Sequence, residues 1–339
     1  MAQLLVAVSD SVFPNLDPVR AVLSKIGAQL QVAPEATPES ILRVASGADA
    51  LLVTYAKITA EMIGQMTRCR IISRFGIGVD NVDIAAATDA GIVVTKVPDY
   101  CIDEVSDHTM ALLLALVRKI PFANAQVHAG RWEMPAVVPI HRLRGSVLGL
   151  VGFGRIPQLV APKAKSFGLR VVACDPYVPQ EVFTRADVDG VDFAQLLKIS
   201  DYISIHSPLL PETKGLFNAD VFRRMKPTAY LINTARGPIV DEAALARALD
   251  AGHLAGAALD VMPQEPPSNS PLLGRDNVIL TPHTSFYSEE SLVELQTKAA
   301  EEVVCVLSGQ TPRNPVNPEV LQRTARTLRS SAASGVAEA

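Results

Sequence analysis

The chain has 339 residues, of which 48% are hydrophobic and 19% charged, and its formal net charge at pH 7 is −4. This composition is typical of a globular protein and excludes a largely disordered one, and the length predicts about two domains. The slightly acidic balance provides no basic surface, which argues against nucleic acid as a direct partner.

Neither a secretion signal nor a membrane span is expected. The N-terminal sequence AQLLVAVSD lacks a basic region and a long apolar region. The longest uncharged apolar run, 110–117, is too short to cross a bilayer. The cysteines are far apart and form no Cys-x-x-Cys pair and no metal-ligand pattern with histidine. We therefore expect a cytoplasmic protein with reduced cysteines, no metal site and no membrane association.

In the first hundred residues, short apolar segments alternate with helix-like segments. Asp17 is a candidate N-cap, and Thr37 with Pro38 marks a second helix start. This alternation predicts a parallel, doubly wound sheet whose turns lack a nucleotide-binding fingerprint. The expected strands are 4–8, 29–32, 50–53, 70–74 and 92–95, and the expected helices are 18–26, 37–44, 59–66 and 83–89.

A long helix is expected over 101–119, with an acidic start and a basic end that suit the helix dipole. Its middle is apolar on every side, so we expect it to be buried between two lobes as a hinge helix. The irregular segment 131–142 follows and contains the single tryptophan, Trp132.

The stretch 147–176 has the order strand, glycine turn, helix, strand, acid that is typical of a dinucleotide-binding unit. Gly152 permits a tight turn, and Gly154 lets the backbone approach a pyrophosphate at the positive end of the following helix. Asp175 is placed to accept hydrogen bonds from ribose hydroxyls and to repel a 2′-phosphate, which favours NAD over NADP. Pro157 replaces the third glycine of the fingerprint; the first turn of a helix tolerates it, at the loss of one donor. A glycine pair alone is weak evidence, because ordinary strand–helix turns also use glycine.

The remaining chain continues the alternation, and the polar strings HSP, NTARG, DVMPQE and TPHTS each follow a predicted strand. Open α/β sheets bind ligands beyond the carboxyl ends of their strands, so these strings are expected to share one site. The expected strands are 147–151, 169–173, 202–206, 229–233, 255–261 and 278–280, and the expected helices are 193–199, 219–224, 241–251 and 291–307.

Three of these strand-end residues have complementary chemistry. Arg236 presents a fork of donors for a carboxylate or a polarised carbonyl. His283 can exchange a proton with a hydroxyl, and Glu265 can hold the second imidazole nitrogen and fix its tautomer. Taken singly, each is more often structural: a strand-end cap, a packed imidazole and a solvated loop acid. Their coincidence at one sheet edge favours a catalytic site for hydride transfer beside a nicotinamide.

Six motifs together resemble the D-isomer-specific 2-hydroxyacid dehydrogenase family, over residues 4 to about 318: FGIGVDNVD, RLRGSVLGLVGFGRIP, ISIHSPLLPETKGLF, LINTARGPIVDEAAL, GAALDVMPQEPP and NVILTPHTS. The resemblance implies an α/β fold of two doubly wound lobes. A Rossmann cofactor domain (101–291) would be inserted into a flavodoxin-like substrate domain (1–100 and 292–325), and 326–339 is expected to be a disordered tail. It also implies NAD-dependent interconversion of a D-2-hydroxy acid and a 2-keto acid, in a homodimer formed mainly through the cofactor lobe, with Arg236, Glu265 and His283 as catalytic residues.

The same resemblance assigns the ligand contacts by motif position. The expected cofactor contacts are Gly152, Gly154, Arg155 and Ile156 at the pyrophosphate, Asp175 at the ribose, Ser207, Pro208 and Thr213 on the adenine side, and Thr234, Ala235 and Asp260 on the nicotinamide side, where Asp260 would accept from the carboxamide. Ile77 in the glycine loop of the N-terminal lobe is expected to approach the cofactor, and Arg236, His283 and Ser285 are also expected to contact it. The expected substrate contacts are Thr54, Tyr55, Gly76, Ile77, Gly78, Arg236 and Phe286, with the substrate carboxylate on the backbone N–H groups of the glycine loop.

Three strings are similar to the carboxy-terminal-binding-protein branch of this family: PDYCIDEVSDHT, GFGRIP and PHTSFYSEES. In that branch the fold serves transcriptional corepression. Phe286 stands where that branch has tryptophan and predicts an apolar wall of the substrate pocket, and Ser285 replaces a glycine that is usual in the family. The alternative functions are therefore an NAD(H)-gated scaffold for protein partners, and a family member that binds NAD weakly because of Pro157.

Overall fold

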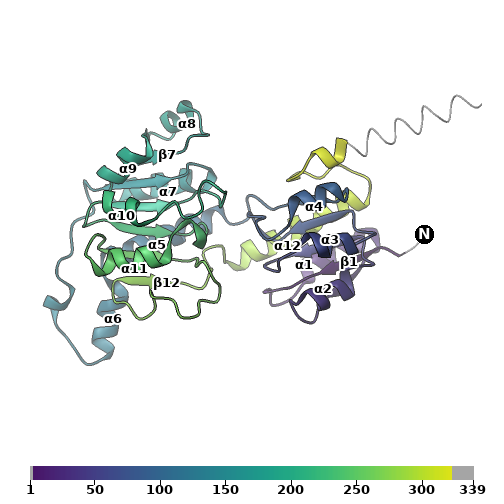
Figure 1. Cartoon of the computed structure of the whole chain (residues 1–339), viewed down its shortest axis with the longest axis horizontal. Coiled ribbons are helices and arrows are strands. Elements are labelled where there is room, and N and C mark those ends of the chain that lie inside the picture. Colours follow the sequence, from purple (N-terminus) through teal and green to yellow (C-terminus); the bar gives the residue numbers. More distant parts are fainter. Residues whose placement is uncertain (1–2, 323–339) are drawn as a thin grey trace, which may run out of the picture. The chain divides into compact units, whose positions relative to one another are not determined.

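The computed structural model describes residues 3–322 (Figure 1). Internal contacts divide these residues into two compact units. The first unit contains the described residues up to Tyr100 and those from Ser288 onward, and the second runs from Cys101 to Tyr287. The chain therefore passes between the units twice. The expected disordered tail, 326–339, lies outside the described residues.

The first unit contains a five-stranded parallel sheet with the order β2-β1-β3-β4-β5, the flavodoxin-like order. Strands β1, β3 and β4 consist almost entirely of buried residues because helices cover both faces, as parallel sheets require. The strands are β1 (Leu5–Val8), β2 (Gln29–Val32), β3 (Ala50–Val53), β4 (Ile71–Arg74) and β5 (Val93–Thr95), and the helices are α1 (Asp17–Leu23), α2 (Pro38–Ala45), α3 (Ala60–Gln65), α4 (Ile84–Asp89) and α12 (Glu289–Leu307).

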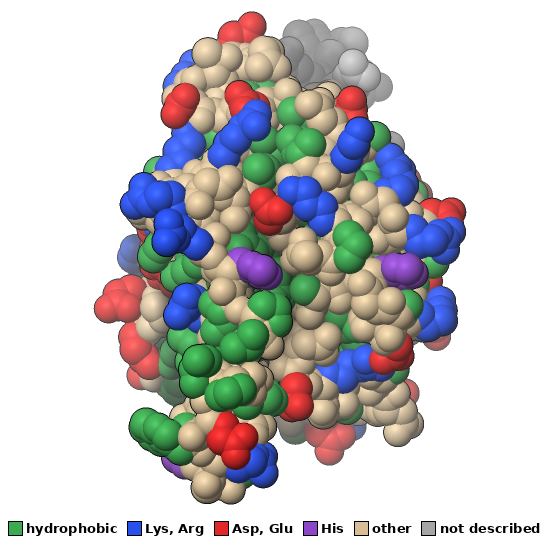
Figure 2. Space-filling view, turned by 90° about the vertical axis from the view of Figure 1, so that its left-hand side faces the viewer, with side chains coloured by type: hydrophobic (Ala, Val, Ile, Leu, Met, Phe, Trp, Pro, Cys, Tyr) green, Lys and Arg blue, Asp and Glu red, His purple; other side chains and the backbone are tan. Residues whose placement is uncertain are grey.

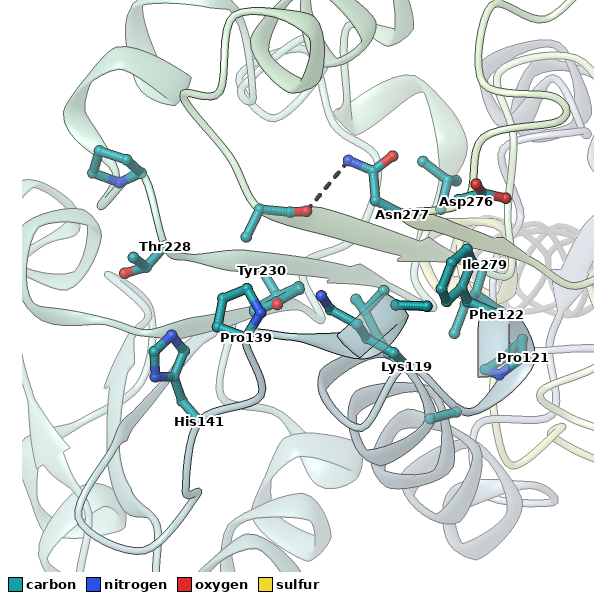
Figure 3. A pocket seen from close by; sticks show the side chains of 16 residues that line it. Lys119, Pro121, Phe122, Pro139, His141, Thr228, Tyr230, Asp276, Asn277 and Ile279 are labelled. Carbon is teal, nitrogen blue, oxygen red and sulfur yellow. Dashed lines mark hydrogen bonds between the residues drawn. The ribbon is translucent and has the colours of Figure 1, made fainter. Parts of the chain in front are cut away.

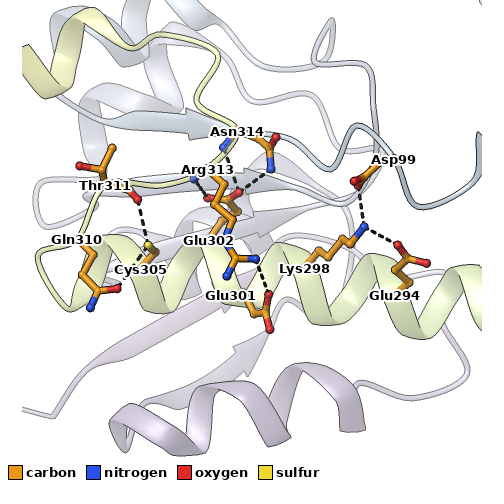
Figure 4. Close-up of polar contacts among 10 residues, drawn as sticks. All are labelled: Asp99, Glu294, Lys298, Glu301, Glu302, Cys305, Gln310, Thr311, Arg313 and Asn314. Atoms are coloured by element: carbon orange, nitrogen blue, oxygen red, sulfur yellow. Dashed lines mark hydrogen bonds and ion pairs between the residues drawn. The ribbon is translucent and has the colours of Figure 1, made fainter. Parts of the chain in front are cut away.

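Helix α12 returns the chain to the first unit and packs against α1, β3 and β4. Buried polar groups attach the segment that follows it (Figure 4). The carboxylate of Glu302, which is 4% exposed, accepts hydrogen bonds from the backbone N–H groups of Arg313 (2.9 Å) and Asn314 (3.1 Å). Lys298 Nζ donates to Asp99 Oδ1 at 2.8 Å and also contacts Glu294. The side chain of Asn317 accepts from Val94 N at 2.8 Å, which joins the end of the described chain to β5.

The second unit contains a seven-stranded parallel sheet with the order β12-β11-β10-β9-β6-β7-β8. The direction of winding reverses between β6 and β9, which is the Rossmann arrangement and places a ligand crevice beyond their carboxyl ends. The expected fold class is therefore confirmed. The strands are β6 (Val147–Val151), β7 (Arg170–Cys174), β8 (Asp189–Gly190), β9 (Tyr202–Ile205), β10 (Tyr230–Asn233), β11 (Gly256–Leu259) and β12 (Val278–Leu280).

Two hydrophobic cores cover the faces of this sheet. One packs side chains of α9, α10 and α11 against the strands, and the other packs α5, α7 and α8. The helices are α5 (Ile102–Val117), α6 (Ile120–His128), α7 (Arg155–Ser166), α8 (Gln180–Arg185), α9 (Phe193–Ile199), α10 (Ala219–Arg224) and α11 (Glu242–Asp250).

Several local expectations need correction. The helix expected over 101–119 ends at Val117, and the separate helix α6 follows it. The break lies at Lys119, whose φ of 53° is left-handed, and Pro121 occupies the first turn of α6, where proline is tolerated. The helix α8 and the short strand β8 were not expected. Asp17 is the first residue of α1 and not its N-cap, and its N–H donates to Asn15 Oδ1 at 3.0 Å.

Within residues 3–322, no single helix has the length and hydropathy needed to cross a bilayer, and only α5 and α6 taken together, bent by 58°, satisfy the length and composition criteria. The same residues contain no group of three or more His, Cys, Asp or Glu side chains that could hold a metal ion.

Candidate active site

The glycine turn after β6 forms a cradle at the switch point of the second sheet. Gly152 has a φ of 91°, and a Cβ there would lie 2.8 Å from Ser207 N and 2.9 Å from the carbonyl carbon of His206. Only glycine fits so close to the end of β9. At Gly154 a Cβ would meet nothing within 4 Å, so the space beside the N-terminus of α7 is open. Arg155 and Ile156 are the first two residues of α7, where N–H groups and the helix dipole favour phosphate.

Asp175 lies at the end of β7 and faces this turn. Its Oδ2 accepts from Phe153 N at 2.8 Å and its Oδ1 accepts from Tyr177 N at 2.9 Å. These bonds fix the orientation of the carboxylate, and each oxygen retains acceptor capacity for a ribose hydroxyl.

The end of β9 supplies a second polar group to the same crevice. Ser207 is 8% exposed, and its Oγ has no hydrogen-bond partner within the described chain. A buried hydroxyl without a partner is costly, so this atom fits a site that a polar ligand completes. Thr213 instead holds its own turn: its Oγ1 donates to Pro208 O and accepts from Leu210 N, each at 2.7 Å. Burial lowers the pKa of the adjacent His206 to about 3, so its ring is neutral near pH 7.

The structure brings the predicted acid and imidazole together. His283 Nδ1 and Glu265 Oε2 lie 2.6 Å apart, and Glu265 Oε1 accepts from Met262 N at 2.9 Å. The side chains are 21% and 35% exposed, so the pair is accessible to a small ligand. Phe286 contacts the imidazole edge to face, with ring centroids 6.2 Å apart.

Arg236 lies at the end of the neighbouring strand β10. Its Nη1 donates to Ala235 O at 2.8 Å, and its carbonyl accepts from Asn233 Nδ2 at 2.9 Å. The next residue, Gly237, has its Cα so close to the loop after β11 that a Cβ would lie 2.0 Å from the carbonyl carbon of Met262. The loops that carry Arg236 and Glu265 are therefore in direct contact.

Asp260, at the end of β11, holds the loop that carries His283. It is 1% exposed, and it accepts hydrogen bonds from Thr281 Oγ1 (2.6 Å), Thr284 N (2.9 Å) and Ser285 N (2.9 Å). Burial opposes ionisation, but the hydrogen bonds from Thr281, Ser285 and Thr284 outweigh it, and the pKa of this carboxyl lies below its usual value. Its expected contact with a nicotinamide carboxamide remains a prediction.

The sequence interpretation missed two side chains of α5 that contact these strand ends. His108 Nε2 lies 3.2 Å from Thr281 Oγ1, and Thr109 Oγ1 lies 3.1 Å from Thr234 Oγ1. The available signal was the polar string SDHT at the start of an otherwise apolar helix.

The residues predicted to contact the substrate from the N-terminal part of the chain lie in the first unit, at the ends of β3 and β4. Thr54 is 3% exposed, and its Oγ1 donates to Asp10 O at 2.9 Å. The Asp10 carboxylate accepts from the N–H groups of Thr54 (3.1 Å) and Tyr55 (2.6 Å) and so fixes this loop. Asp10 was not predicted as a site residue, although it lies two residues after the end of the first strand. Gly76 has a φ of 148°, and a Cβ there would overlap the guanidinium of Arg74 at 1.4 Å from Nη1.

A cavity of about 430 Å³ in the second unit is separate from these groups (Figure 3). It lies at the opposite edge of the sheet, beside Tyr230 and Val278, the first residues of β10 and β12. Lys119 and His141 also line it, and none of the predicted site residues does.

Residues 110–285 match the family model described as "D-isomer specific 2-hydroxyacid dehydrogenase, NAD binding domain". The chain belongs to the D-isomer-specific 2-hydroxyacid dehydrogenase family. The matched region covers the glycine cradle, Asp175, Ser207 and the His283–Glu265 pair, and the cofactor of this domain is NAD.

Relatives and solved structures agree with this assignment. The chain is 40% identical to D-3-phosphoglycerate dehydrogenase of Methanocaldococcus jannaschii over 87% of its own length, but it spans only 56% of that relative. It is 41% identical to glyoxylate reductase of Thermofilum pendens, covering 84% of this chain and 86% of that protein. D-lactate dehydrogenase of Aquifex aeolicus, solved with NAD and lactic acid, has a TM-score of 0.82 at 28% identity and covers 92% of this chain and 99% of its own. The chain thus spans about half the length of the phosphoglycerate dehydrogenases that it matches.

Proposed function

We propose that this protein is an NAD-dependent D-2-hydroxyacid dehydrogenase that interconverts a small 2-hydroxy acid and its 2-keto acid. The observation that carries this proposal is the 2.6 Å contact between His283 Nδ1 and Glu265 Oε2, on the same sheet edge as the glycine cradle. An imidazole fixed by a carboxylate is a suitable acid–base group for a hydroxyl.

The roles follow from this geometry. Glu265 holds Nδ1, so Nε2 is the nitrogen that we assign to the substrate oxygen. In oxidation, Nε2 removes the hydroxyl proton while a hydride leaves C2; in reduction, protonated Nε2 returns that proton to the carbonyl oxygen. Bound NAD⁺ would accept the hydride in oxidation, and bound NADH would supply it in reduction. The guanidinium of Arg236 binds the substrate's carboxylate or polarises its carbonyl.

The cofactor would be held by the groups that the structure gathers at the switch point. The open N-terminus of α7 binds the pyrophosphate, Asp175 accepts from the ribose, and Ser207 Oγ gains its missing partner. Pro157 lies in the first turn of α7, as expected, where its missing N–H breaks no helical bond, which supports ordinary NAD affinity.

For the first unit, we propose that Gly76, Ile77 and Gly78 bind the substrate carboxylate and that Tyr55 lines the substrate site. Tyr55 is 40% exposed, whereas the hydroxyl of Thr54 is used within its own loop, so Tyr55 is the better candidate of the two. Phe286 supplies an apolar wall beside the imidazole.

The proposal is tested by NADH oxidation with glyoxylate, pyruvate, hydroxypyruvate and 3-phosphohydroxypyruvate. We expect turnover with at least one of these acids and none in His283→Ala. NADH that binds, as judged from its fluorescence, without turnover of any acid would contradict an enzymatic function. The relatives described above are dehydrogenases and reductases, and they give no support to the alternative of a protein-binding scaffold.

We also propose a homodimer formed through the second unit. Segment 120–142 carries large apolar side chains in solvent: Ile120 is 56%, Trp132 87% and Met134 74% exposed. Figure 2 shows the left-hand side of the view in Figure 1, and hydrophobic side chains gather at its lower end, where α6 lies in Figure 1. Surfaces of this kind commonly mark protein interfaces. We expect light scattering to give twice the chain mass, and Trp132→Ser with Met134→Ser to give a monomer; a monomeric native protein would refute the dimer.

We propose a cytoplasmic location, which is supported by the lack of a disulfide among the cysteines of residues 3–322, namely Cys69, Cys101, Cys174 and Cys305. Four thiols titratable in the denatured, unreduced protein are expected, and a disulfide in protein isolated from cells would count against this location.

A further inference from the structure

Helix α5 makes a side-chain contact with the catalytic loop that the proposed reaction does not yet explain. His108 Nε2 lies 3.2 Å from Thr281 Oγ1 and 3.6 Å from Asp260 Oδ1. The imidazole is 24% exposed and the Asp260 carboxylate is fully buried. His108 is therefore part of a largely enclosed polar group at the ends of β11 and β12.

The direction of each hydrogen bond in this group can be assigned. Thr281 Oγ1 lies 2.6 Å from Asp260 Oδ1, and an ionised carboxylate can only accept, so the single hydroxyl proton of Thr281 points to Asp260. Thr281 Oγ1 must then accept from His108. Only the tautomer of His108 with a proton on Nε2 gives His108, Thr281 and Asp260 a consistent set of hydrogen-bond donors and acceptors.

These hydrogen bonds extend to the loop that carries His283. Asp260 accepts from the N–H groups of Thr284 and Ser285, both at 2.9 Å. The N–H of His283 lies 2.8 Å from Asp260 O and 3.0 Å from Thr281 O. His283 has a φ of 53°, a left-handed conformation that a non-glycine residue keeps only when its surroundings hold it. The loop therefore depends on Asp260 and Thr281 being fixed.

His108 also connects two distant segments of the chain. Helix α5 begins directly after the first passage between the units, at Tyr100–Cys101, and the 281–285 loop directly precedes the second, at Tyr287–Ser288. Within the second unit, His108 joins these two segments. Its neighbour Thr109 makes a parallel contact with Thr234 at the end of β10.

We propose that His108 is a positioning residue of the active site, which donates through Nε2 to Thr281 and thereby, with Asp260, holds the loop that orients His283. This inference rests on the proposed function for its kinetic consequence. The positioning itself is a property of the second unit and is measurable without substrate.

The test compares His108→Leu, which removes the donor, with His108→Gln, whose amide nitrogen can donate from a similar distance. We expect the leucine variant to lower kcat at least 5-fold with less than a 2-fold change in the Kd for NADH, and the glutamine variant to stay within about 2-fold of the native kcat. Thr281→Val should lower kcat comparably, and His108→Leu added to Thr281→Val should cost little more, because the two side chains act through one contact.

A second readout separates this inference from the proposed reaction. Amide hydrogen exchange of the cofactor-free protein at Thr284 and Ser285 should be faster in His108→Leu and native-like in His108→Gln. His253→Leu, a change at an exposed histidine of the same unit, should alter neither readout. If native protein reduces no keto acid, the proposed function fails, while the exchange data still decide the positioning role.

Two results would overturn the positioning role of His108. If His108→Leu had native rates of amide exchange at Thr284 and Ser285 and a kcat within 2-fold of native, the contact of His108 with Thr281 would not position the loop. If His108→Gln and His108→Leu lowered kcat equally, the shape of the imidazole ring would matter and its Nε2 hydrogen-bond donor would not. Should the leucine variant fail to fold, His108→Asn, which is polar but too short to reach Thr281, replaces it with the same expected result.

Discussion

Gly237 offers the sharpest test of how the active site is assembled. It directly follows Arg236 and has its Cα against the loop that leads to Glu265. In Gly237→Ala, the new Cβ would lie 2.0 Å from the carbonyl carbon of Met262, 2.1 Å from its oxygen and 2.4 Å from Pro263 N. All three are backbone atoms, so no side-chain rotation relieves the overlap.

The magnitude follows from that distance. Carbon atoms in ordinary contact lie about 3.5 Å apart, so the two loops must separate by about 1.5 Å. A misplacement of about 1 Å between catalytic groups and substrate can cost about 100-fold in rate. We therefore expect kcat/KM to fall by about 100-fold. Overpacking of this kind typically costs about 1–3 kcal/mol of stability, which leaves a folded protein.

The assay is steady-state NADH oxidation with the best keto acid, together with urea unfolding and NADH binding followed by fluorescence. Gly64→Ala is the matched control: Gly64 lies in α3 of the first unit, and a Cβ there meets nothing within 4 Å. That change should leave kcat/KM unaltered and raise stability by up to about 1 kcal/mol. Activity of Gly237→Ala within 3-fold of native would show that the approach of these loops does not position Arg236 and Glu265.

Three further predictions concern single side chains. Asp175→Ala should permit use of NADPH, because the carboxylate no longer repels a 2′-phosphate; negligible NADPH oxidation in that variant would assign the discrimination elsewhere. His283→Ala should abolish turnover and spare NADH binding, and retained turnover would remove this imidazole from the acid–base role. Burial lowers the pKa of His206 from 6.5 to about 3, so below pH 6.5 the unfolded chain binds a proton that the folded chain does not. The free energy of unfolding should therefore decrease as the pH is lowered from 7 to 5, by up to about 2 kcal/mol. Urea unfolding at pH 7 and pH 5 should show a smaller fall in His206→Gln, and an unchanged fall would contradict this account.

Much of the site was readable from local signals. Gly152 and Asp175 each follow a buried strand, as predicted. The roles that we propose for them depend on short stretches of backbone that the residue types themselves favour. The alternation of apolar and helix-like segments predicted the parallel sheets, because the side-chain periods of strands and helices are properties of the backbone. The chemistry of Arg236, Glu265 and His283 likewise belongs to their side chains wherever the chain places them.

The tertiary structure decided what depends on contacts between distant segments. The contact of His283 with Glu265, the saturation of Asp260 by Thr281 and its neighbours, and the donation from His108 in α5 all join residues that are far apart in sequence. The left-handed backbone of Lys119 between α5 and α6 was also hidden, although Pro121 in the first turn of α6 was a signal of a helix start that the sequence interpretation did not use. Residue type determines what a side chain can do, but packing determines which partner it meets, and the function that we propose for this site depends on those partners.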